Sequence, residues 1–466
     1  MSLRRLLYHG AVYGLTSATA RFLNWLLTPL YVHRLSVEDY GRLSELYSWM
    51  VFGLIATGLG METAYFRFGE KDRMGGTFWK VLGLLLGFAV MLNVPLMVMV
   101  PFVSASLGYA SQEELLWLTI GIWTIDALGS FALAYQRALG APVRFAVIQL
   151  SHVGLFMLLN VWGVGLRSYG LRFILWANLF ASFLRLAWGL LWGPSVRSPM
   201  DNTPAVSLLL RYGIVLAFMG LLGATNDVLD RVLLARYSLT ETALYGAAYK
   251  AAMALALFVQ AYRQAGEPLL LGRYRHSERF FLRSWVLYHA IALAGLTFLL
   301  LWVKPLLTTR WGGLLPRPIF PEAYHECFRV ISILLWANLL TGSLIQASIW
   351  YKRRANPAIG ILITGTGSLI TWLGNLYGIP RFGYVASAWT TLAAYGSMTL
   401  LSLGMGYKGR GMRLLLAPLM IPASVAVLIT AVEPCLSEGV EIRSFLTVIG
   451  WVGVGLPAYA FLKKKR

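Results

Sequence analysis

Cysteine is scarce in this chain, and the motifs of several enzyme classes are missing. The two cysteines, Cys327 and Cys435, lie far apart and provide neither a disulfide framework nor the spacing of metal ligands. The sequence also contains no glycine-rich loop that would cradle phosphates and no nucleophile motif. We therefore expect no metal site, no cofactor and no ATP hydrolysis, and the chain is not predicted to be an enzyme.

Charged residues are also few. They make up 13% of the 466 residues, whereas hydrophobic residues make up 58% and the mean hydropathy is +0.64. A soluble domain is typically about 45–50% apolar and about 25% charged, so the composition predicts an all-α polytopic membrane protein. The net charge of +20 does not indicate nucleic-acid binding, because the basic residues lie mostly in short connections between apolar runs.

The apolar runs are long enough for about fourteen transmembrane helices. Their predicted ranges are 8–32, 43–66, 79–103, 114–137, 144–166, 170–193, 211–236, 244–266, 281–303, 325–349, 357–377, 383–406, 412–432 and 443–462. The first range has features of a signal peptide around Ala18-Thr19-Ala20. Its apolar character continues past Arg21 to Val32, however, as in a helix that crosses the membrane.

Basic residues are concentrated in the connections on one side of the predicted membrane, and this side includes both chain ends. The positive-inside rule assigns that side to the cytoplasm. We therefore expect a multi-pass protein of the bacterial cytoplasmic (inner) membrane with both termini in the cytoplasm.

The chain also repeats itself, in the same order and the same direction across the membrane. The matched segments are 24–36 with 226–238, Tyr40-Gly41 with Tyr245-Gly246, Glu62 with Glu267, 137–142 with 353–357, and 169–176 with 382–389. Such a parallel repeat predicts two pseudo-symmetric six-helix lobes that enclose a substrate site and move against each other. The predicted N-lobe is 1–193, the C-lobe is 194–406, and 407–466 adds two C-terminal helices.

Polar residues of the first predicted helix share one face. They are Ser17, Arg21, Asn24 and Thr28. Arg21 lies about eleven residues, or roughly 16 Å, from the outer end of its helix, and a guanidinium at that depth suits a lipid diphosphate, because it binds phosphate oxygens bidentately. We predict that Arg21 and Asn24 bind substrate; the alternative is an internal ion pair between Arg21 and an acid such as Asp126.

A second group of ionisable residues lies in the seventh and eighth predicted helices. Asp227 and Arg231 are one helical turn apart and can pair along one face. This leaves Asp230 with Lys250 as its nearest candidate partner. Asp227 and Asp230 are candidates for a coupling-ion site, and Arg231 and Lys250 are candidate substrate ligands. The alternative is a charge-neutral strut that stiffens this part of the chain.

Glu62 and Glu267 lie at the predicted cytoplasmic ends of the second and eighth helices, in equivalent positions of the repeat. They are candidates for a cytoplasmic gate, formed with Arg67 or Arg273 in one conformation and broken in the other. The alternative is simple solvation at the membrane interface.

The remaining interior charges bear on the nature of the cargo. Asp126 and Arg185 are isolated in the predicted N-lobe, and we expect a mutual salt bridge rather than a contact with substrate. Across the predicted helices the basic residues outnumber the acidic ones. They are Arg21, Arg185, Arg231, Lys250 and Arg329 against Asp126, Asp227 and Asp230. This balance favours an anionic cargo over a cationic drug.

Four segments carry a resemblance to a known family. They are Leu35-Ser-Val-Glu-Asp-Tyr40-Gly41-Arg42, Gly58-Leu-Gly-Met-Glu-Thr-Ala-Tyr65-Phe66-Arg67, Arg211-Tyr-Gly213 and Asp230-Arg231. Over essentially its whole length the chain resembles the Wzx-type polysaccharide flippases of the multidrug/oligosaccharidyl-lipid/polysaccharide exporter superfamily. The resemblance implies that an undecaprenyl-diphosphate-linked oligosaccharide crosses from the cytoplasmic to the outer leaflet by alternating access. It implies a polyprenyl-diphosphate-linked glycan, membrane lipids, and a glycan polymerase or glycosyltransferases as partners, and no nucleic acid.

Other functions stay open at this point. Nothing in the sequence excludes a flippase for the peptidoglycan lipid precursor, and a cation-coupled multidrug antiporter of the same superfamily is a further alternative. A membrane enzyme such as a glycan polymerase or ligase is expected to carry a large outer loop. The longest outer connection, 304–324, is too short for one.

Overall fold

The computed structural model describes residues 3–69, 74–195, 203–272, 277–310, 317–354, 357–407, 409–433 and 440–464. Every regular element within these ranges is a helix. The long helices are α1 (Leu3–Arg34), α2 (Val37–Gly58), α4 (Met74–Val103), α5 (Glu113–Ala138), α6 (Pro142–Asn160), α7 (Leu171–Leu191), α8 (Val206–Ala235), α9 (Leu239–Ala251), α10 (Met253–Leu271), α11 (Glu278–Thr308), α12 (Phe328–Ala347), α14 (Pro357–Phe382), α15 (Tyr384–Gly406), α17 (Met420–Val432) and α18 (Val440–Lys464). The short ones are α3 (Met61–Phe68), α13 (Ile349–Arg353), α16 (Arg410–Leu416), the π-helix η2 (Val161–Leu166), and the 3-10 turns η4 (Glu322–Cys327) and η5 (Ala417–Leu419).

The helices make this a multi-pass membrane protein, as the composition predicts. Among the described residues, ten helical segments are long and apolar enough to cross a membrane, and the pair α9–α10, bent by 50°, raises that number to eleven. The three other predicted crossings coincide with the long helices α1, α2 and α15. Fourteen crossings remain a prediction.

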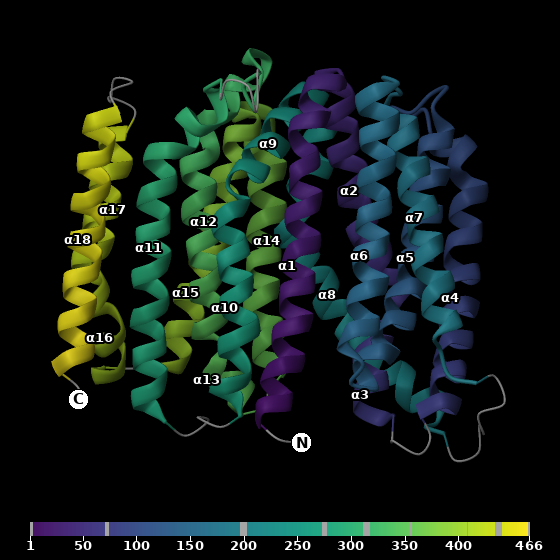
Figure 1. Cartoon of the computed structure of the whole chain (residues 1–466), viewed down its shortest axis with the longest axis horizontal. Coiled ribbons are helices and arrows are strands. Elements are labelled where there is room, and N and C mark those ends of the chain that lie inside the picture. The colour runs from purple at the N-terminus through teal and green to yellow at the C-terminus, as the bar shows by residue number, and fades with distance from the viewer. Residues whose placement is uncertain are drawn as a thin grey trace. The chain divides into compact units, whose positions relative to one another are not determined.

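The chain forms two compact units, Met1–Ala243 and Leu244–Arg466. In the first unit α5 packs against α2, α4, α6 and α7 (Figure 1). Small residues permit this close packing, as is usual between helices in membranes. A Cβ added to Gly53 of α2 would overlap the Trp123 ring of α5, and one added to Gly189 of α7 would lie 2.8 Å from the Cβ of Ala132.

The second unit is built around α12 and α15. These two helices pack on each other, α14 covers α15, and α10 and α11 cover α12. The last two helices, α17 and α18, pack on α11 (Figure 1). Gly450 of α18 makes this contact close, because a Cβ there would lie 3.1 Å from Ile429 and 3.3 Å from Thr297.

The same helix pairings occur in both units. The pairs α5–α7, α4–α5, α6–α7 and α2–α5 of the first unit correspond in sequence order to α12–α15, α11–α12, α14–α15 and α10–α12 of the second. A parallel repeat requires this recurrence. The lobe boundaries predicted at 193 and 406 follow the sequence repeat and remain a prediction.

Two fully buried asparagines give a local example of the recurrence. Asn160 of α6 donates from Nδ2 to the Phe156 carbonyl oxygen at 2.8 Å, and Asn375 of α14 donates to the Thr371 carbonyl oxygen at 2.7 Å. Each Oδ1 accepts a hydroxyl proton from a neighbouring helix. The donor is Tyr31 at 3.0 Å in the first case and Ser387 at 2.7 Å in the second. Equivalent asparagines therefore accept from hydroxyls of different helices, α1 in the first unit and α15 in the second.

Candidate functional site

The predicted crossing 43–66 is not one continuous helix. Leu59 and Gly60 adopt the left-handed backbone conformation, with φ of 46° and 61°, and they separate α2 from α3. At this break the backbone touches α8. A Cβ on Gly60 would lie 2.7 Å from the Cβ of Leu216 and 2.8 Å from the carbonyl oxygen of Gly213, and a Cβ on Gly213 would overlap the carbonyl oxygen of Leu59. Two of the sequence motifs, 58–67 and 211–213, therefore contact each other through glycine.

A second close approach lies at the other end of α2. A Cβ on Gly41 would overlap the carbonyl oxygen of Leu239 in the first turn of α9. Beside it, Arg236 at the end of α8 donates from Nη1 to the carbonyl oxygen of Ser106 at 3.2 Å. Thus α8 and the start of α9 touch the rest of the first unit at both ends of α2.

Aromatic side chains fix α3 in place. Phe78 of α4 stacks on Phe131 of α5 with ring centroids 5.3 Å apart, and Tyr65 of α3 meets Phe131 edge-on at 5.4 Å. The Tyr65 hydroxyl also donates to the carbonyl oxygen of Met74 at 3.1 Å. Each such ring pair contributes about 0.5–1.5 kcal/mol beyond its burial. These contacts therefore hold α3, and the charges that it carries, in one orientation.

The structure pairs Glu62 of α3 with Arg137 at the end of α5, not with Arg67. The distance from Glu62 Oε1 to Arg137 Nη2 is 2.5 Å. Arg67 instead lies over the ring of Tyr212, 4.9 Å from its centroid, beside the glycine contact at Gly213. Arg67 therefore joins α3 to α8, and its role in a gate remains a prediction.

Glu267 has a similar arrangement in the second unit. Its Oε1 lies 2.6 Å from Nζ of Lys352 in α13. Lys352 precedes α14 by as many residues as Arg137 precedes α6, so the two ion pairs occupy equivalent places in the repeat. Arg273, the other predicted partner of Glu267, lies outside the described residues.

The charges of α8 divide between two faces of that helix. Asp230 is 1% exposed, shares its face with the buried Asn226, and accepts the backbone N–H of Arg231 on Oδ1 at 2.8 Å. Asp227 is exposed and Arg231 half-buried, on the neighbouring face. Lys250 is half-buried in α9 and belongs to the second unit. The coupling-ion and ligand roles of these residues remain predictions.

Arg21 and Asn24 lie beside the packed stripe of α1 and not within it. The buried positions of this helix include Thr16, Ala20, Leu27, Thr28, Tyr31 and Val32, and α6 is the main helix that packs against α1. Arg21 and Asn24 are exposed. Two of the four residues of the predicted polar face are therefore accessible from outside the packed helices.

The sequence did not predict that Glu45 of α2 is a buried acid. It is 3% exposed, and its Oε2 accepts the Tyr109 hydroxyl at 2.7 Å while Oε1 accepts Nε1–H of Trp49 at 3.3 Å. Arg42 and Arg236 interact with it electrostatically. Burial, and then the Glu45 carboxylate, raise the pKa of Tyr109 well above its usual value, so the hydroxyl stays a donor. The cluster ties α2, the α4–α5 connection and α8 together.

Replacing Tyr109 with phenylalanine should lower the free energy of unfolding by about 1–3 kcal/mol, because it leaves a buried Glu45 oxygen without its donor. Thermal unfolding of the purified protein in detergent measures the change. The matched control is Trp49→Phe, which removes the longer bond to the other oxygen and should cost less. Equal losses for the two variants would contradict this ranking.

The expected salt bridge between Asp126 and Arg185 is confirmed. Arg185 Nη2 lies 2.8 Å from Asp126 Oδ1 and 3.2 Å from the carbonyl oxygen of the same residue. Arg185 is 9% exposed and Asp126 24%. The pair joins α5 to α7 inside the first unit and so belongs to the scaffold.

The fold has counterparts among solved structures. No family model and no curated protein matches the sequence. Among solved structures, the lipid II flippase MurJ in an inward closed conformation superposes with a TM-score of 0.75 at 10% identity, over 97% of this chain and 99% of that one. An inward-facing multidrug resistance MATE family transporter of the MOP superfamily gives 0.67 at 14% identity, over 83% and 94%. An outward-facing conformation of a transporter of the same description gives 0.62 at 14% identity, over 88% and 95%.

The fold is that of these transporters. A match over 97% of the chain leaves too few residues unmatched to omit α17 and α18. The likeness therefore includes the two C-terminal helices, and it is a likeness of fold.

Proposed function

We propose that this protein is a Wzx-type flippase that moves an undecaprenyl-diphosphate-linked oligosaccharide from the cytoplasmic to the outer leaflet, by alternating access through a cationic cavity between its lobes. The observation that carries the proposal is the exposure of Arg21 and Asn24 on α1, beside its packed stripe. A sugar diphosphate cannot cross hydrocarbon unaided, because transfer of each unpaired polar group from water into hydrocarbon costs several kilocalories per mole of free energy. A guanidinium within the membrane replaces the water that solvates the diphosphate.

The likeness to a structure named as a lipid II flippase supports a lipid-linked cargo, because it extends to the C-terminal helix pair. The MATE structure with a TM-score of 0.67 covers 83% of the chain, a smaller share. A flippase for the peptidoglycan precursor shares the chemistry of the proposal and is the second candidate.

A cation-coupled multidrug antiporter is a third candidate, and the buried acids Glu45 and Asp230 are the observation that favours it. Coupling is not required for a flippase. Outward movement of a negative headgroup follows an inside-negative potential, worth about 2.3 kcal/mol per charge per 100 mV. We propose Asp227 and Asp230 as the ion site if transport proves to be ion-coupled.

Alternating access also needs contacts that open. We propose the glycine contact of Gly60 with Gly213 as part of the cytoplasmic gate, together with Arg67 and the ion pairs of Glu62 and Glu267. We further propose that Arg231 and Lys250 receive the diphosphate as the site opens outward.

Neutralising Arg21 in the variant Arg21→Gln should slow flipping about tenfold or more, because charge-assisted hydrogen bonds contribute about 1.5–3 kcal/mol. The measurement uses proteoliposomes that contain a polyprenyl-diphosphate oligosaccharide, lipid II or a cationic rhodamine dye. The control Arg172→Gln removes an exposed arginine of α7 and should leave the rate unchanged. An unimpaired Arg21→Gln variant contradicts the substrate role. Transport of the dye without flipping of either lipid favours the antiporter.

A further inference from the structure

A pocket of about 500 Å³ opens in the second unit where α11 begins, α13 ends and α16 begins. Both positive and negative side chains line it. Its polar and aromatic residues are Glu278, Phe281, Trp350, Arg353, Arg354 and Tyr407. The positive-inside rule predicts that this end of the unit faces the cytoplasm, so the pocket is expected at the level of the lipid headgroups in the inner leaflet.

Aromatic rings hold the two arginines of the pocket. Arg353 donates from Nε and Nη2 to the carbonyl oxygen of Leu270, both at 3.3 Å, and its Cζ lies 5.7 Å from the centroid of the Phe281 ring. Arg354 is exposed and its Cζ lies 5.4 Å from the centroid of Trp350. Such stacking orients a guanidinium, and the exposed Arg354 is the one that a phosphate oxygen reaches most directly.

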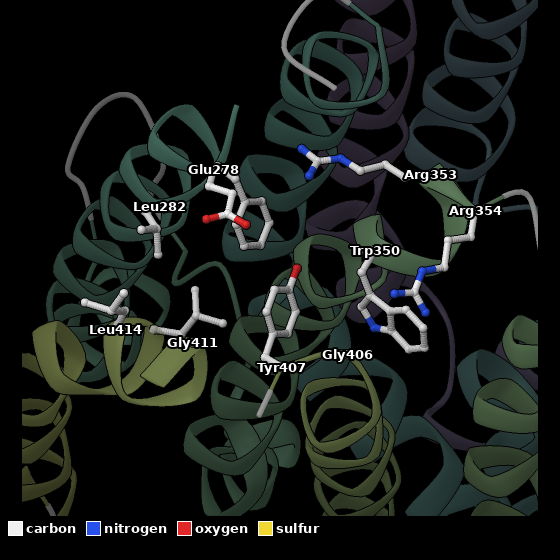
Figure 2. Close-up of a pocket in the computed structure, with 11 residues that line it drawn as sticks. Glu278, Leu282, Trp350, Arg353, Arg354, Gly406, Tyr407, Gly411 and Leu414 are labelled. Carbon is white, nitrogen blue, oxygen red and sulfur yellow. The ribbon is translucent and has the colours of Figure 1, made fainter. Parts of the chain in front are cut away.

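The acid of the pocket lies across from the arginines. Glu278 is in the first turn of α11, and Figure 2 shows its carboxylate on one side of Tyr407 and Trp350 on the other. The Tyr407 ring stacks on Phe281, with centroids 5.6 Å apart and planes 6° apart. Burial raises the pKa of Tyr407, Arg353 lowers it and Glu278 raises it again. The phenol is therefore a neutral donor under the influence of both charges.

Leucines complete the lining. Leu282 of α11 and Leu414 and Leu415 of α16 form an apolar wall next to the charges. A soluble anion has no apolar part that could pack against this wall, whereas the glycerol backbone and first methylenes of a lipid would cover it.

We propose that this pocket binds the headgroup of a zwitterionic phospholipid of the phosphatidylethanolamine type. The phosphate lies against the guanidiniums of Arg353 and Arg354, and the ammonium lies against the Glu278 carboxylate and the neighbouring aromatic faces. A phosphatidylglycerol headgroup supplies no cation to Glu278, and a free phosphate would be repelled by that carboxylate. The proposal does not depend on the identity of the cargo.

Native mass spectrometry of the full-length protein tests the proposal, with equimolar phosphatidylethanolamine and phosphatidylglycerol added to the same detergent micelles. We expect the wild type to retain phosphatidylethanolamine in preference. Arg354→Ala should lower retention of both lipids about tenfold, the effect of losing one charge-assisted contact. Glu278→Gln should keep binding and lose the preference between the two lipids. Arg413→Ala, an exposed arginine of α16 that does not line the pocket, is the matched control and should behave as the wild type.

Two results would overturn the proposal. One is an equal affinity of the wild type for the two lipids, or a preference that survives in Glu278→Gln. The other is displacement of the lipid by soluble phosphoethanolamine at equal concentration, which would make the ligand a soluble one. Glu278 is exposed, so this variant is expected to fold even if the arginine variant does not.

Discussion

Replacing Gly213 with alanine should impair transport at least tenfold and lower the free energy of unfolding by about 1–3 kcal/mol, the usual effect of overpacking. The reason is the contact between α8 and the break that follows α2. A Cβ at Gly213 would overlap the carbonyl oxygen of Leu59, so a backbone and not a flexible side chain has to move. Flipping in proteoliposomes and thermal unfolding in detergent measure the two effects.

The matched control lies on the same helix. A Cβ on Gly223 meets nothing within 4 Å, so Gly223→Ala should leave transport unchanged. Its stability should be equal or slightly higher, because alanine is the better helix former by about 1 kcal/mol. Gly213→Ala should therefore be the less stable of the two variants. If Gly213→Ala transports at the wild-type rate, the glycine contact is not a gate.

Removing one partner of the Asp126–Arg185 pair should cost about 3–5 kcal/mol, because it leaves an uncompensated charge inside the first unit. Asp126→Leu is the more damaging single change, because it leaves Arg185, the more buried of the two, without its partner charge. Thermal unfolding of the purified variant measures the loss, and the double variant with Arg185→Leu should recover a large part of it.

An exposed ion pair provides the comparison. Arg172 and Glu114 join the ends of α7 and α5 at 2.9 Å, with side chains 62% and 36% exposed. Breaking this pair should cost no more than about 1 kcal/mol, the usual value for a surface pair. Similar losses for the buried and the exposed pair would show that the membrane interior does not set the cost at Asp126.

The sequence predicted what depends on composition and on isolated charges. The apolar runs predicted an all-helical membrane protein, and Asp126 and Arg185 paired as expected because both were interior charges without a neighbour in sequence. It did not predict the break of the second crossing at Leu59 and Gly60. A membrane run tolerates glycine whether or not the helix ends there, so the pattern of Gly58-Leu-Gly60 alone does not distinguish the two.

Contacts between distant segments explain the other omissions. Glu45 lies just inside the predicted range 43–66 and looks like an interfacial acid in sequence. Its burial depends on Tyr109, which the α4–α5 connection brings to it. The motifs 58–67 and 211–213 carried the family resemblance, yet nothing in either indicates that the two meet. The partners of Glu62 and Glu267 likewise depend on how α5 and α13 end.

The buried side-chain amides of Asn160 and Asn375 allow the two halves of the repeat to be compared within one protein. One substitution, asparagine to leucine, can be made at either place, and each place has the same backbone acceptor one turn earlier and a hydroxyl donor from a neighbouring helix. Detergent and lipid can then be kept the same for both measurements. Any difference between the two outcomes reports how much each half of the repeat depends on its buried amide.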